Sequence, residues 1–409
     1  MIAAHPLIPR TFSTLRRLTA LTAVVTLALT ISSCTTTGKS DDDPVISSLN
    51  AQEADAAAPR NLRSIMDTNP LSSAEGTVSM ITSDENGKKG SVSGDLTTTV
   101  VSRDPSTDKF QWAVSIKPAV ATEKRAHYGY SPQSAMSENM GRSSTGSVVV
   151  SPDGRHLSLI LLPAEQQAGE SAADLRTHIV VLDAQTGKAV RTAEFSGVVL
   201  GQALTNGTLA VETAQNYFPA GSGKGTITTF SLTDTSAQPS SFPTDKWLVG
   251  ATRENLVLAP DLLPDDCFDT CSMTTVSLIN TDGAINENVT GVTAVYPGGW
   301  IHRFTNPKAA SDFQQRLEAA SKDERKSLSP SREAAEEQLV NPSIKKTIDI
   351  TGKSTFERGV PTGPGLLVEQ DVPTGNGSTE SKPAFWLSAA DDGHRHTENL
   401  EQFKDNKDE

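Results

Sequence analysis

A short strand, a tight turn and a second apolar strand recur five times along this chain of 409 residues. Each copy places Gly, Asn or Asp at its turn, and these residues accept the positive φ angles that tight hairpins impose. Successive turns lie 53, 48, 44 and 66 residues apart, from Gly154 to Gly365. The copies begin at Ser147, Val198, Lys246, Val292 and Phe356. The pattern therefore predicts a repeat of antiparallel hairpins.

A second strand unit follows each hairpin at a similar offset. These units begin at Thr177, Gly225, Thr274, Lys345 and Ala384. Four strands in about 45 residues match the size of one β-propeller blade. Residues 76–116 carry a further, more diverged unit, and the chain ends offer a seventh by pairing across the closure. We expect an all-β fold over residues 71–400, a β-propeller of six to seven four-stranded blades, with β-sandwich domains as the alternative.

Two of the repeats resemble known propeller families. The segment VVVSPDGRHLSLIL looks like the Ser-Pro-Asp-Gly turn of repeats related to the tryptophan-aspartate and TolB-type families. The segment IVVLDAQTGKAV is similar to the blade unit of quinoprotein-like propellers, and there we expect Asp183 and Thr186 to close the turn with Gly187 in the left-handed region. The tryptophan of the quinoprotein blade would fall at Arg191 and is absent. The resemblance therefore supports the fold and implies no cofactor.

The N-terminus has the order of a secretory signal. Arg10, Arg16 and Arg17 precede an uncharged stretch from Leu18 to Ile31, which is too short to span a bilayer as a helix. The sequence ISSC that ends at Cys34 resembles the bacterial lipobox, in which the cysteine is lipidated after cleavage. We therefore predict a lipoprotein signal peptide at residues 1–33 and a lipid on Cys34. An ordinary signal peptide with a chance cysteine is the alternative.

The charge of the chain limits its partners. The predicted signal holds three basic and no acidic residues, so its removal changes the net charge from −13 to −16. A body this acidic repels phosphates, which argues against nucleic acid or an anionic membrane face as its partner, and we expect no nucleic-acid partner. Residues 34–70 are rich in Thr, Ser, Asp, Ala and Gln, and we expect the lipidated end and a flexible linker there. We expect residues 401–409 to form a polar tail.

Residues 306–340 interrupt the strand pattern. Asn306 followed by Pro307 is a recurrent helix start, and apolar residues then follow at helical spacing. Ser329-Pro330 indicates a second short helix through Leu339. We predict a helical insertion at 306–340, either an ornament on a blade edge or a partner-docking element.

The two remaining cysteines, Cys267 and Cys271, are spaced C-x-x-x-C. Export to an oxidising compartment favours a disulfide between them. Four residues of extended strand would separate their Cα atoms by roughly 13 Å, whereas a disulfide needs less than about 7 Å. The pair is therefore expected at a turn, as a structural disulfide.

Catalytic signals are weak in this sequence. Asp392, His394 and His396 could collect a metal ion, but a solvated hairpin turn explains them better. His302 has no partner carboxylate or nucleophile nearby in the sequence. No nucleophile elbow, phosphate-binding loop or zinc-protease helix occurs. We therefore name no catalytic, cofactor-binding or metal-binding residue.

These observations predict a lipoprotein held on the extracytoplasmic face of the cell membrane by Cys34. Its propeller is expected to act as a binding or scaffolding module for a protein or glycan of the cell envelope. The alternative is a propeller enzyme, either a hydrolase or a quinoprotein-like oxidoreductase. Bound calcium or quinone in the purified protein would favour that alternative.

Overall fold

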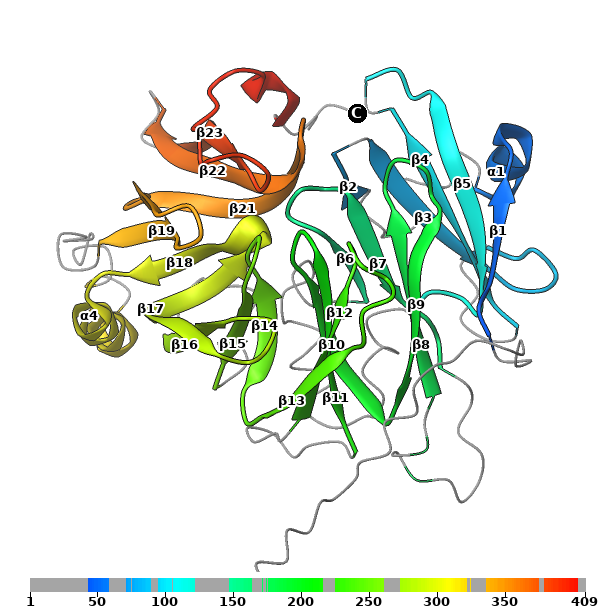
Figure 1. Cartoon of the computed structure of the whole chain (residues 1–409). Coiled ribbons are helices and arrows are strands. Elements are labelled where there is room, and N and C mark those ends of the chain that lie inside the picture. The colour runs from blue at the N-terminus through cyan, green and yellow to red at the C-terminus, as the bar shows by residue number, and fades with distance from the viewer. Residues whose placement is uncertain are drawn as a thin grey trace, which may run out of the picture. The chain divides into compact units, whose positions relative to one another are not determined.

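The computed structural model describes residues 43–58, 71–74, 76–89, 95–104, 106–121, 147–163, 171, 174, 176–215, 225–260, 273–321, 324, 336–374 and 379–403. The chain divides into two units, Met1–Asp43 and Pro44–Glu409. Every helix and strand described below belongs to the second unit (Figure 1).

The described residues form mainly strands. The strands are β1 (Val45–Leu49), β2 (Leu71–Ser72), β3 (Thr77–Ser83), β4 (Thr97–Arg103), β5 (Phe110–Lys117), β6 (Val148–Val150), β7 (His156–Ile160), β8 (Arg176–Asp183), β9 (Ala189–Ser196), β10 (Val198–Leu204), β11 (Thr208–Ala214), β12 (Gly225–Ser231), β13 (Ser240–Thr244), β14 (Trp247–Ala251), β15 (Leu256–Ala259), β16 (Thr274–Ile279), β17 (Ile285–Tyr296), β18 (Trp300–Phe304), β19 (Glu337–Asn341), β20 (Lys346–Asp349), β21 (Lys353–Val360), β22 (Gly363–Pro373) and β23 (Thr379–Ser388). The helices are α1 (Ala51–Ala57) and α4 (Pro307–Ala319), with short 3₁₀ turns η3 (Pro297–Gly299) and η5 (Leu400–Phe403).

The strands pair antiparallel into five sheets that contain six blade-like units. Blade 1 has the order β1-β5-β4-β3-β2, blade 2 is β6 to β9, and blade 3 is β10 to β13. The seven-stranded sheet β14 to β20 holds two blades, because β17 pairs with β16 through its first part and with β18 through Val292–Tyr296. We call β14 to β17 blade 4, β17 to β20 blade 5, and β21 to β23 blade 6. The predicted all-β, propeller-type fold is confirmed.

Alternation along each strand explains how the blades pack. On β8 of blade 2, Val180 and Leu182 face a core shared with blade 1, while Ile179 and Val181 face a core shared with blade 3. Successive side chains of a strand point to opposite faces, so a strand between two neighbours needs apolar residues at every position. The whole stretch Thr177–Leu182 is buried. Similar clusters join blade 3 to 4 and blade 5 to 6.

The predicted hairpin turns meet one another in the folded chain. The amide of Ala74 in blade 1 donates to the carbonyl of Gly154 in blade 2, at 3.2 Å. The amide of Asp153 donates to Asn206 Oδ1 in blade 3 at 3.2 Å, and the amide of Asn206 donates to the carbonyl of Arg253 in blade 4 at 2.9 Å. The turns of blades 1 to 4 are therefore hydrogen-bonded in succession.

The same chain of turns continues to blade 6 and back to blade 1. Arg253 donates from Nε to the carbonyl of Ala389 at 3.4 Å, and from Nη2 to the carbonyl of Asp391. Gly363, in the hairpin of blade 6, lies so close to Ala74 that a Cβ there would be 3.2 Å from its nitrogen. Strand β2 also contacts β21 and β22. Blade 6 is thus in contact with blade 1, and the sheets form a closed circuit.

Local turn chemistry agrees with the sequence at the repeat that resembles quinoprotein blades. Asp183 Oδ1 accepts from the amide and the hydroxyl of Thr186, at 2.8 and 2.7 Å. Gly187 has φ +67°, and a Cβ there would lie 2.4 Å from the Trp112 ring of blade 1. The predicted roles of these three residues in the turn are confirmed.

Part of the predicted linker is folded, which corrects the expectation for residues 34–70. Strand β1 pairs with β5 in full register, and α1 follows it directly. Asn50 caps α1, with its side chain accepting from the Glu53 amide while the Glu53 carboxylate accepts from the Asn50 amide. Ala54 is buried against blade 1, beside Ile81 and Val101. A capping box and a few small apolar residues suffice because blade 1 supplies the rest of the core.

The helical insertion is shorter than predicted. Helix α4 begins after Asn306, whose Oδ1 accepts from the Ala309 amide at 3.1 Å, as expected for this cap. The predicted second helix through Leu339 is wrong at its end, because Glu337–Asn341 forms β19 between β18 and β20. Leu339 is fully buried there, since pairing in blade 5 outweighs its local helix preference.

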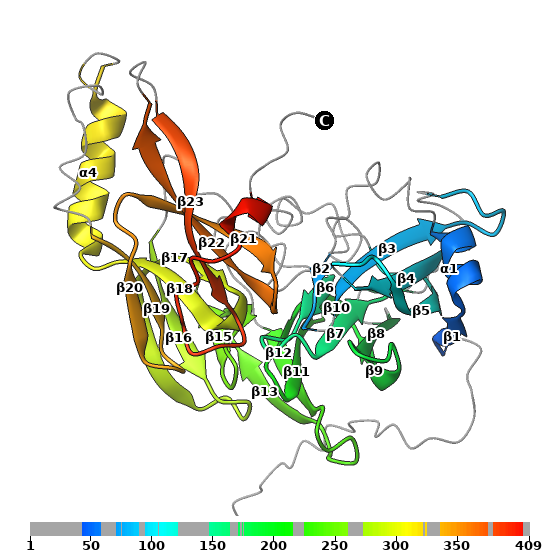
Figure 2. The same ribbon diagram turned by 90° about the horizontal axis from the view of Figure 1, so that it is seen from above.

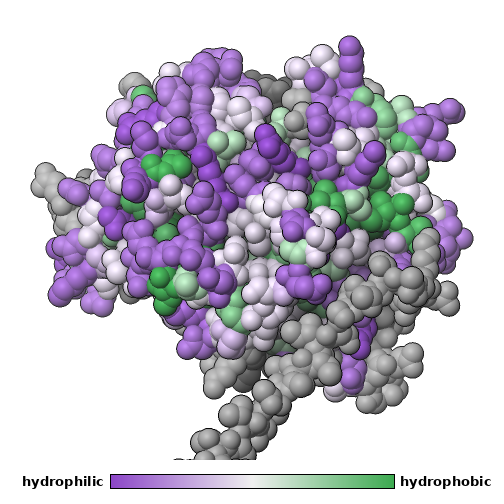
Figure 3. Space-filling model, viewed as in Figure 1, coloured by the Kyte–Doolittle hydropathy of each residue, from purple (hydrophilic) through white to green (hydrophobic). Residues whose placement is uncertain are grey.

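The surface is mostly polar. Figure 3 shows a largely hydrophilic face with separate small groups of hydrophobic residues. Among the described residues, the large hydrophobic side chains that are exposed are Val45, Ile285 and Phe356, at 55%, 61% and 38%. Ile285 is the one that borders the cleft described next.

Candidate binding site

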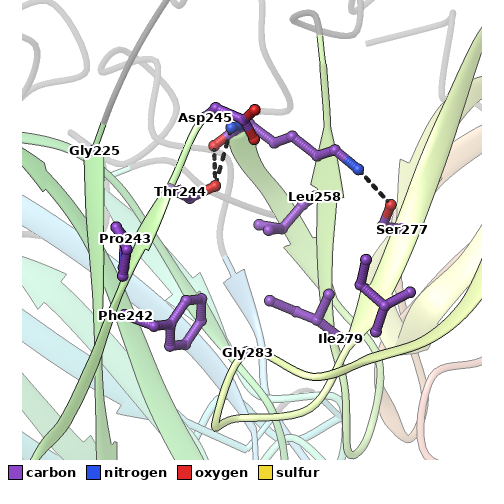
Figure 4. A pocket seen from close by; sticks show the side chains of 11 residues that line it. Gly225, Phe242, Pro243, Thr244, Asp245, Leu258, Ser277, Ile279 and Gly283 are labelled. Atoms are coloured by element: carbon purple, nitrogen blue, oxygen red, sulfur yellow. Dashed lines mark hydrogen bonds between the residues drawn. The ribbon is translucent and has the colours of Figure 1, made fainter.

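A cleft of about 420 Å³ lies between blades 3 and 4. Blades 3 and 4 are neighbours (Figure 2), and the residues that line the cleft come from β12 and β13 on one side and from β15, β16 and the beginning of β17 on the other (Figure 4). It is lined by Gly225, Phe242, Pro243, Thr244, Asp245, Lys246, Leu258, Ser277, Ile279, Gly283 and Ile285. Its volume falls within the roughly 300–1,000 Å³ that is usual for ligand pockets.

One end of the cleft is polar, and a turn positions its lysine. Thr244 Oγ1 accepts from the amide of Lys246 at 3.0 Å and donates to its carbonyl at 2.9 Å. The Lys246 side chain reaches the other wall, because its Nζ donates to Ser277 Oγ at 2.7 Å; in Figure 4 a dashed line marks a hydrogen bond to Ser277. Ser277 in turn donates to Asn288 Oδ1 at 2.7 Å. This fixes the ammonium group at the cleft end while leaving it two further hydrogens to donate.

The other end of the cleft is apolar. Phe242 of β13 packs against Gly283, where a Cβ would lie 2.9 Å from the phenyl ring (Figure 4). Leu258 and Ile279 are buried, and Ile285 stands exposed at the rim. Gly283 has φ +92° in the turn between β16 and β17, so glycine serves both the turn and the contact.

A buried carboxyl group lies behind the wall of the cleft. Glu212 of β11 is 3% exposed, and its Oε2 accepts from the amide of Leu248 at the first strand of blade 4, at 2.9 Å. Gly225 adjoins it, because a Cβ at Gly225 would be 2.8 Å from Glu212 Oε1. Burial raises the pKa of Glu212 to about 7, against the smaller opposing effect of the Leu248 hydrogen bond. This group joins the two blades that form the cleft.

His302, for which the sequence offered no partner, has one in the structure. Its Nε2 lies 3.2 Å from Oε2 of Glu337 on the neighbouring strand β19. The two residues are 35 positions apart, so sequence proximity could not reveal the pair.

The predicted histidine turn near the C-terminus forms a compact cluster. His396 Nε2 and Nδ1 each lie 2.6 Å from a carboxylate oxygen, of Asp391 and Glu398 respectively. Its ring stacks on Trp386 with centroids 3.8 Å apart. Burial lowers the pKa of His396, but the hydrogen bonds to Asp391 and Glu398 outweigh it and raise the pKa above its usual value.

The candidate ligands Asp392, His394 and His396 are not brought together as a metal site. Asp392 extends toward Arg253, with Oδ1 3.5 Å from its Nη1. His394 meets the His396 ring edge-on at 4.6 Å. Within the part of the chain that the structure describes, no group of three or more His, Cys, Asp or Glu residues has metal-binding geometry.

The three cysteines lie outside the described residues. Cys34 belongs to the first unit, and Cys267 and Cys271 belong to the connection between β15 and β16. Lipidation of Cys34 and the disulfide between Cys267 and Cys271 therefore stay predictions.

Sequence reasoning did not find the cleft. Its walls come from residues about 40 positions apart, such as Phe242 and Ile285, which blade stacking brings together. The available signals were indirect: an Asp-Gly turn at Asp282 and Gly283, and Pro243 within a strand-like segment. Proline inside a strand indicates a sheet edge, where its missing N–H costs no ladder bond.

Comparisons with known proteins extend this description only slightly. No family model matches the chain, and no curated protein matches it. Among solved structures, the uncomplexed acylaminoacyl peptidase of Pyrococcus horikoshii aligns with 76% of this chain at 10% identity and a TM-score of 0.35. TolB from Acinetobacter baumannii aligns with 80% at 10% identity and a TM-score of 0.30. The chain spans 43% of the length of the peptidase and 67% of that of TolB. The fold assignment rests on the sheets and their contacts.

Proposed function

We propose that this protein is a lipid-anchored binding module of the extracytoplasmic membrane face, and that it holds a partner in the cleft between blades 3 and 4. The cleft carries the proposal: it combines a buried apolar floor, an exposed apolar rim at Ile285 and a fixed ammonium group at Lys246. Pockets that bind ligands combine apolar walls with a few placed polar groups in this way.

Anchoring through Cys34 rests on the sequence of the N-terminus. A cysteine that carries two or more acyl chains is held stably at a bilayer, which one chain does not achieve. Among the described residues, no helix is both long and apolar enough to cross a membrane. Metabolic labelling with a fatty-acid analogue tests the anchor, and we expect labelling of the wild type and none of Cys34→Ala. Equal labelling of both would refute it.

A photo-crosslinking amino acid at Ile285 tests the binding role in intact cells. Ile285 is exposed at the cleft rim, so a bound partner should give a discrete adduct from this position. Phe356 is the matched control, because it is an exposed hydrophobic residue on β21 of blade 6. Adducts from both positions alike, or from neither, would contradict a partner at the cleft.

The enzyme alternative is raised by one observation, the pairing of His302 with Glu337. A histidine beside a carboxylate can act in general acid–base catalysis. We expect His302→Ala and His394→Ala to leave the Ile285 adduct unchanged. A turnover activity that either change abolished, with the fold preserved, would favour the enzyme.

A further inference from the structure

We infer that the cleft between blades 3 and 4 binds the carboxyl-terminal end of an extended peptide with an apolar last side chain. This inference rests on the binding role proposed above and names the chemistry of the ligand.

Lys246 provides the first step of the argument. Within the described part of the chain, its ammonium group forms no ion pair, and its one side-chain partner is the hydroxyl of Ser277. Asp245 lines the same end of the cleft, but its carboxylate is not within 4.0 Å of Lys246 Nζ. Among the described residues, no carboxylate is paired with this ammonium group. A ligand carboxylate would supply it with charge-assisted hydrogen bonds.

The apolar end of the cleft favours an apolar side chain on the ligand residue that carries this carboxylate. Phe242, Leu258 and Ile279 form its floor, and Ile285 covers its rim at 61% exposure. A side chain of leucine or phenylalanine type that reached this floor would remove Ile285 from water as well. Burial of apolar surface stabilises binding by roughly 25 cal/mol per Å².

Strand β13 indicates a peptide and not a fatty acid. Blade 3 ends at β13, which pairs with β12 and, among the described residues, has no strand on its other side. The cleft runs along residues 242–246, so this open edge borders it (Figure 4). Pro243 removes one donor from this edge, so an extended backbone would hydrogen-bond to its other N–H and C=O groups. Recognition by strand addition and carboxylate capture is known for peptide ligands. A fatty-acid chain would leave these backbone groups unused.

Titration calorimetry with the full chain in lipid nanodiscs tests the inference. The probes are the peptide Gly-Ser-Gly-Ser-Leu with a free carboxylate, the same peptide as its C-terminal amide, and decanoate. We expect the free acid to bind at least about tenfold more tightly than the amide, since a charge-assisted hydrogen bond contributes more than the 1.4 kcal/mol of a tenfold change.

Substitutions at the two ends of the cleft locate the contact. Lys246→Met should abolish the difference between acid and amide, and Asp245→Asn should strengthen binding of the acid by removing a like charge. Lys188→Met is the matched control, because this exposed lysine lies in the β8–β9 turn of blade 2 and its loss changes the net charge equally. Ile285→Ser, at a position that is 61% exposed, should weaken binding of the free-acid peptide.

Equal binding of acid and amide would overturn the inference, as would an unchanged preference in Lys246→Met. Binding of decanoate without binding of either peptide would overturn the inference of a peptide ligand and favour a fatty acid. Absence of binding by all three probes would also overturn it. The Ile285 crosslink reports on the proposed function separately, so an adduct without peptide binding would reject this ligand and retain the binding role.

Discussion

At the scale of single residues, glycines set how closely the turns approach. Gly154 has φ +70°, and a Cβ there would lie 2.4 Å from the Ala74 nitrogen of blade 1. Gly87 has nearly the same φ, +73°, but a Cβ there would meet nothing within 4 Å. The pair separates the cost of the backbone conformation from the cost of the contact between blades.

We expect Gly87→Ala to lower the free energy of unfolding by about 1–2 kcal/mol, the cost of a left-handed alanine. Gly154→Ala should lower it clearly further, because the methyl group also forces blades 1 and 2 apart. Urea unfolding followed by tryptophan fluorescence measures both. Equal losses would show that the turn contact between blades 1 and 2 contributes nothing.

Glu212 makes stability depend on pH. Its pKa is about 7 in the folded chain against 4.5 for the ordinary group, so between these values the folded state binds more protons than the unfolded state. The free energy of unfolding therefore falls as pH rises through this window, by about 3 kcal/mol in all. The penalty is absent below the window and complete above it.

Glu212→Gln should remove this dependence. The amide oxygen can still accept from Leu248 and cannot ionise, so the variant should gain on the wild type between about pH 5 and pH 8. Glu287→Gln, on the exposed part of β17, is the control for the same chemical change. Urea unfolding at both pH values measures the change in the free energy of unfolding. An equal change with pH in wild type and Glu212→Gln would contradict the expected role of burial.

At the scale of elements, a buried cation pairs α1 with blade 1, in addition to the packing of Ala54. Arg103 of β4, with 3% of its side chain exposed, pairs with Asp55 of α1. Asp55→Ala would remove the closer carboxylate from this guanidinium. Its remaining carboxylate neighbour is then Asp108, whose Oδ1 lies 3.9 Å from Arg103 Nε. Because Asp55 is 48% exposed, we expect a loss of only about 1–2 kcal/mol, confined to this contact.

Hydrogen exchange measured by mass spectrometry should therefore show faster exchange in β1 and α1 of Asp55→Ala and little change in blade 3. Gln52→Ala, at an exposed position of α1, is the control. Unchanged exchange in Asp55→Ala would mean that the buried alanines alone hold the helix.

The elements also show which structure the sequence could predict. Hairpins were predictable because Asp183, Thr186 and Gly187 form their turn by local bonds. Strand β1 and helix α1 were not, since 12 residues with little apolar surface depend on blade 1 for their core. The cleft depends on packing between blades 3 and 4, and side-chain pairs such as Lys246 and Ser277 span 31 positions. Local sequence patterns therefore predicted the strands and turns of the blades. The cleft between blades could not be predicted in this way, because it depends on how the blades pack against each other.

At the scale of the whole folded unit, Pro44–Glu409, the closed circuit of turns couples distant blades. Arg253 is its bridge from blade 4 to blade 6, through the carbonyls of Ala389 and Asp391. Its side chain is 19% exposed, so these hydrogen bonds are partly shielded from water. Loss of this bridge would leave the carbonyls of the buried Ala389 and the partly buried Asp391 to find other donors, which costs free energy.

We expect Arg253→Met to speed hydrogen exchange in blade 6 and also in strand β2 of blade 1, because β2 rests on β21 and β22. Arg155→Met is the matched control: Arg155 follows the same kind of turn in blade 2, but its side chain is 74% exposed and its Nε lies 4.0 Å from Asp153 of its own turn. Faster exchange confined to blade 4 in Arg253→Met would mean that the blades open independently. Faster exchange in blades 1 and 6 together, absent from Arg155→Met, would mean that the circuit stabilises all of its members at once.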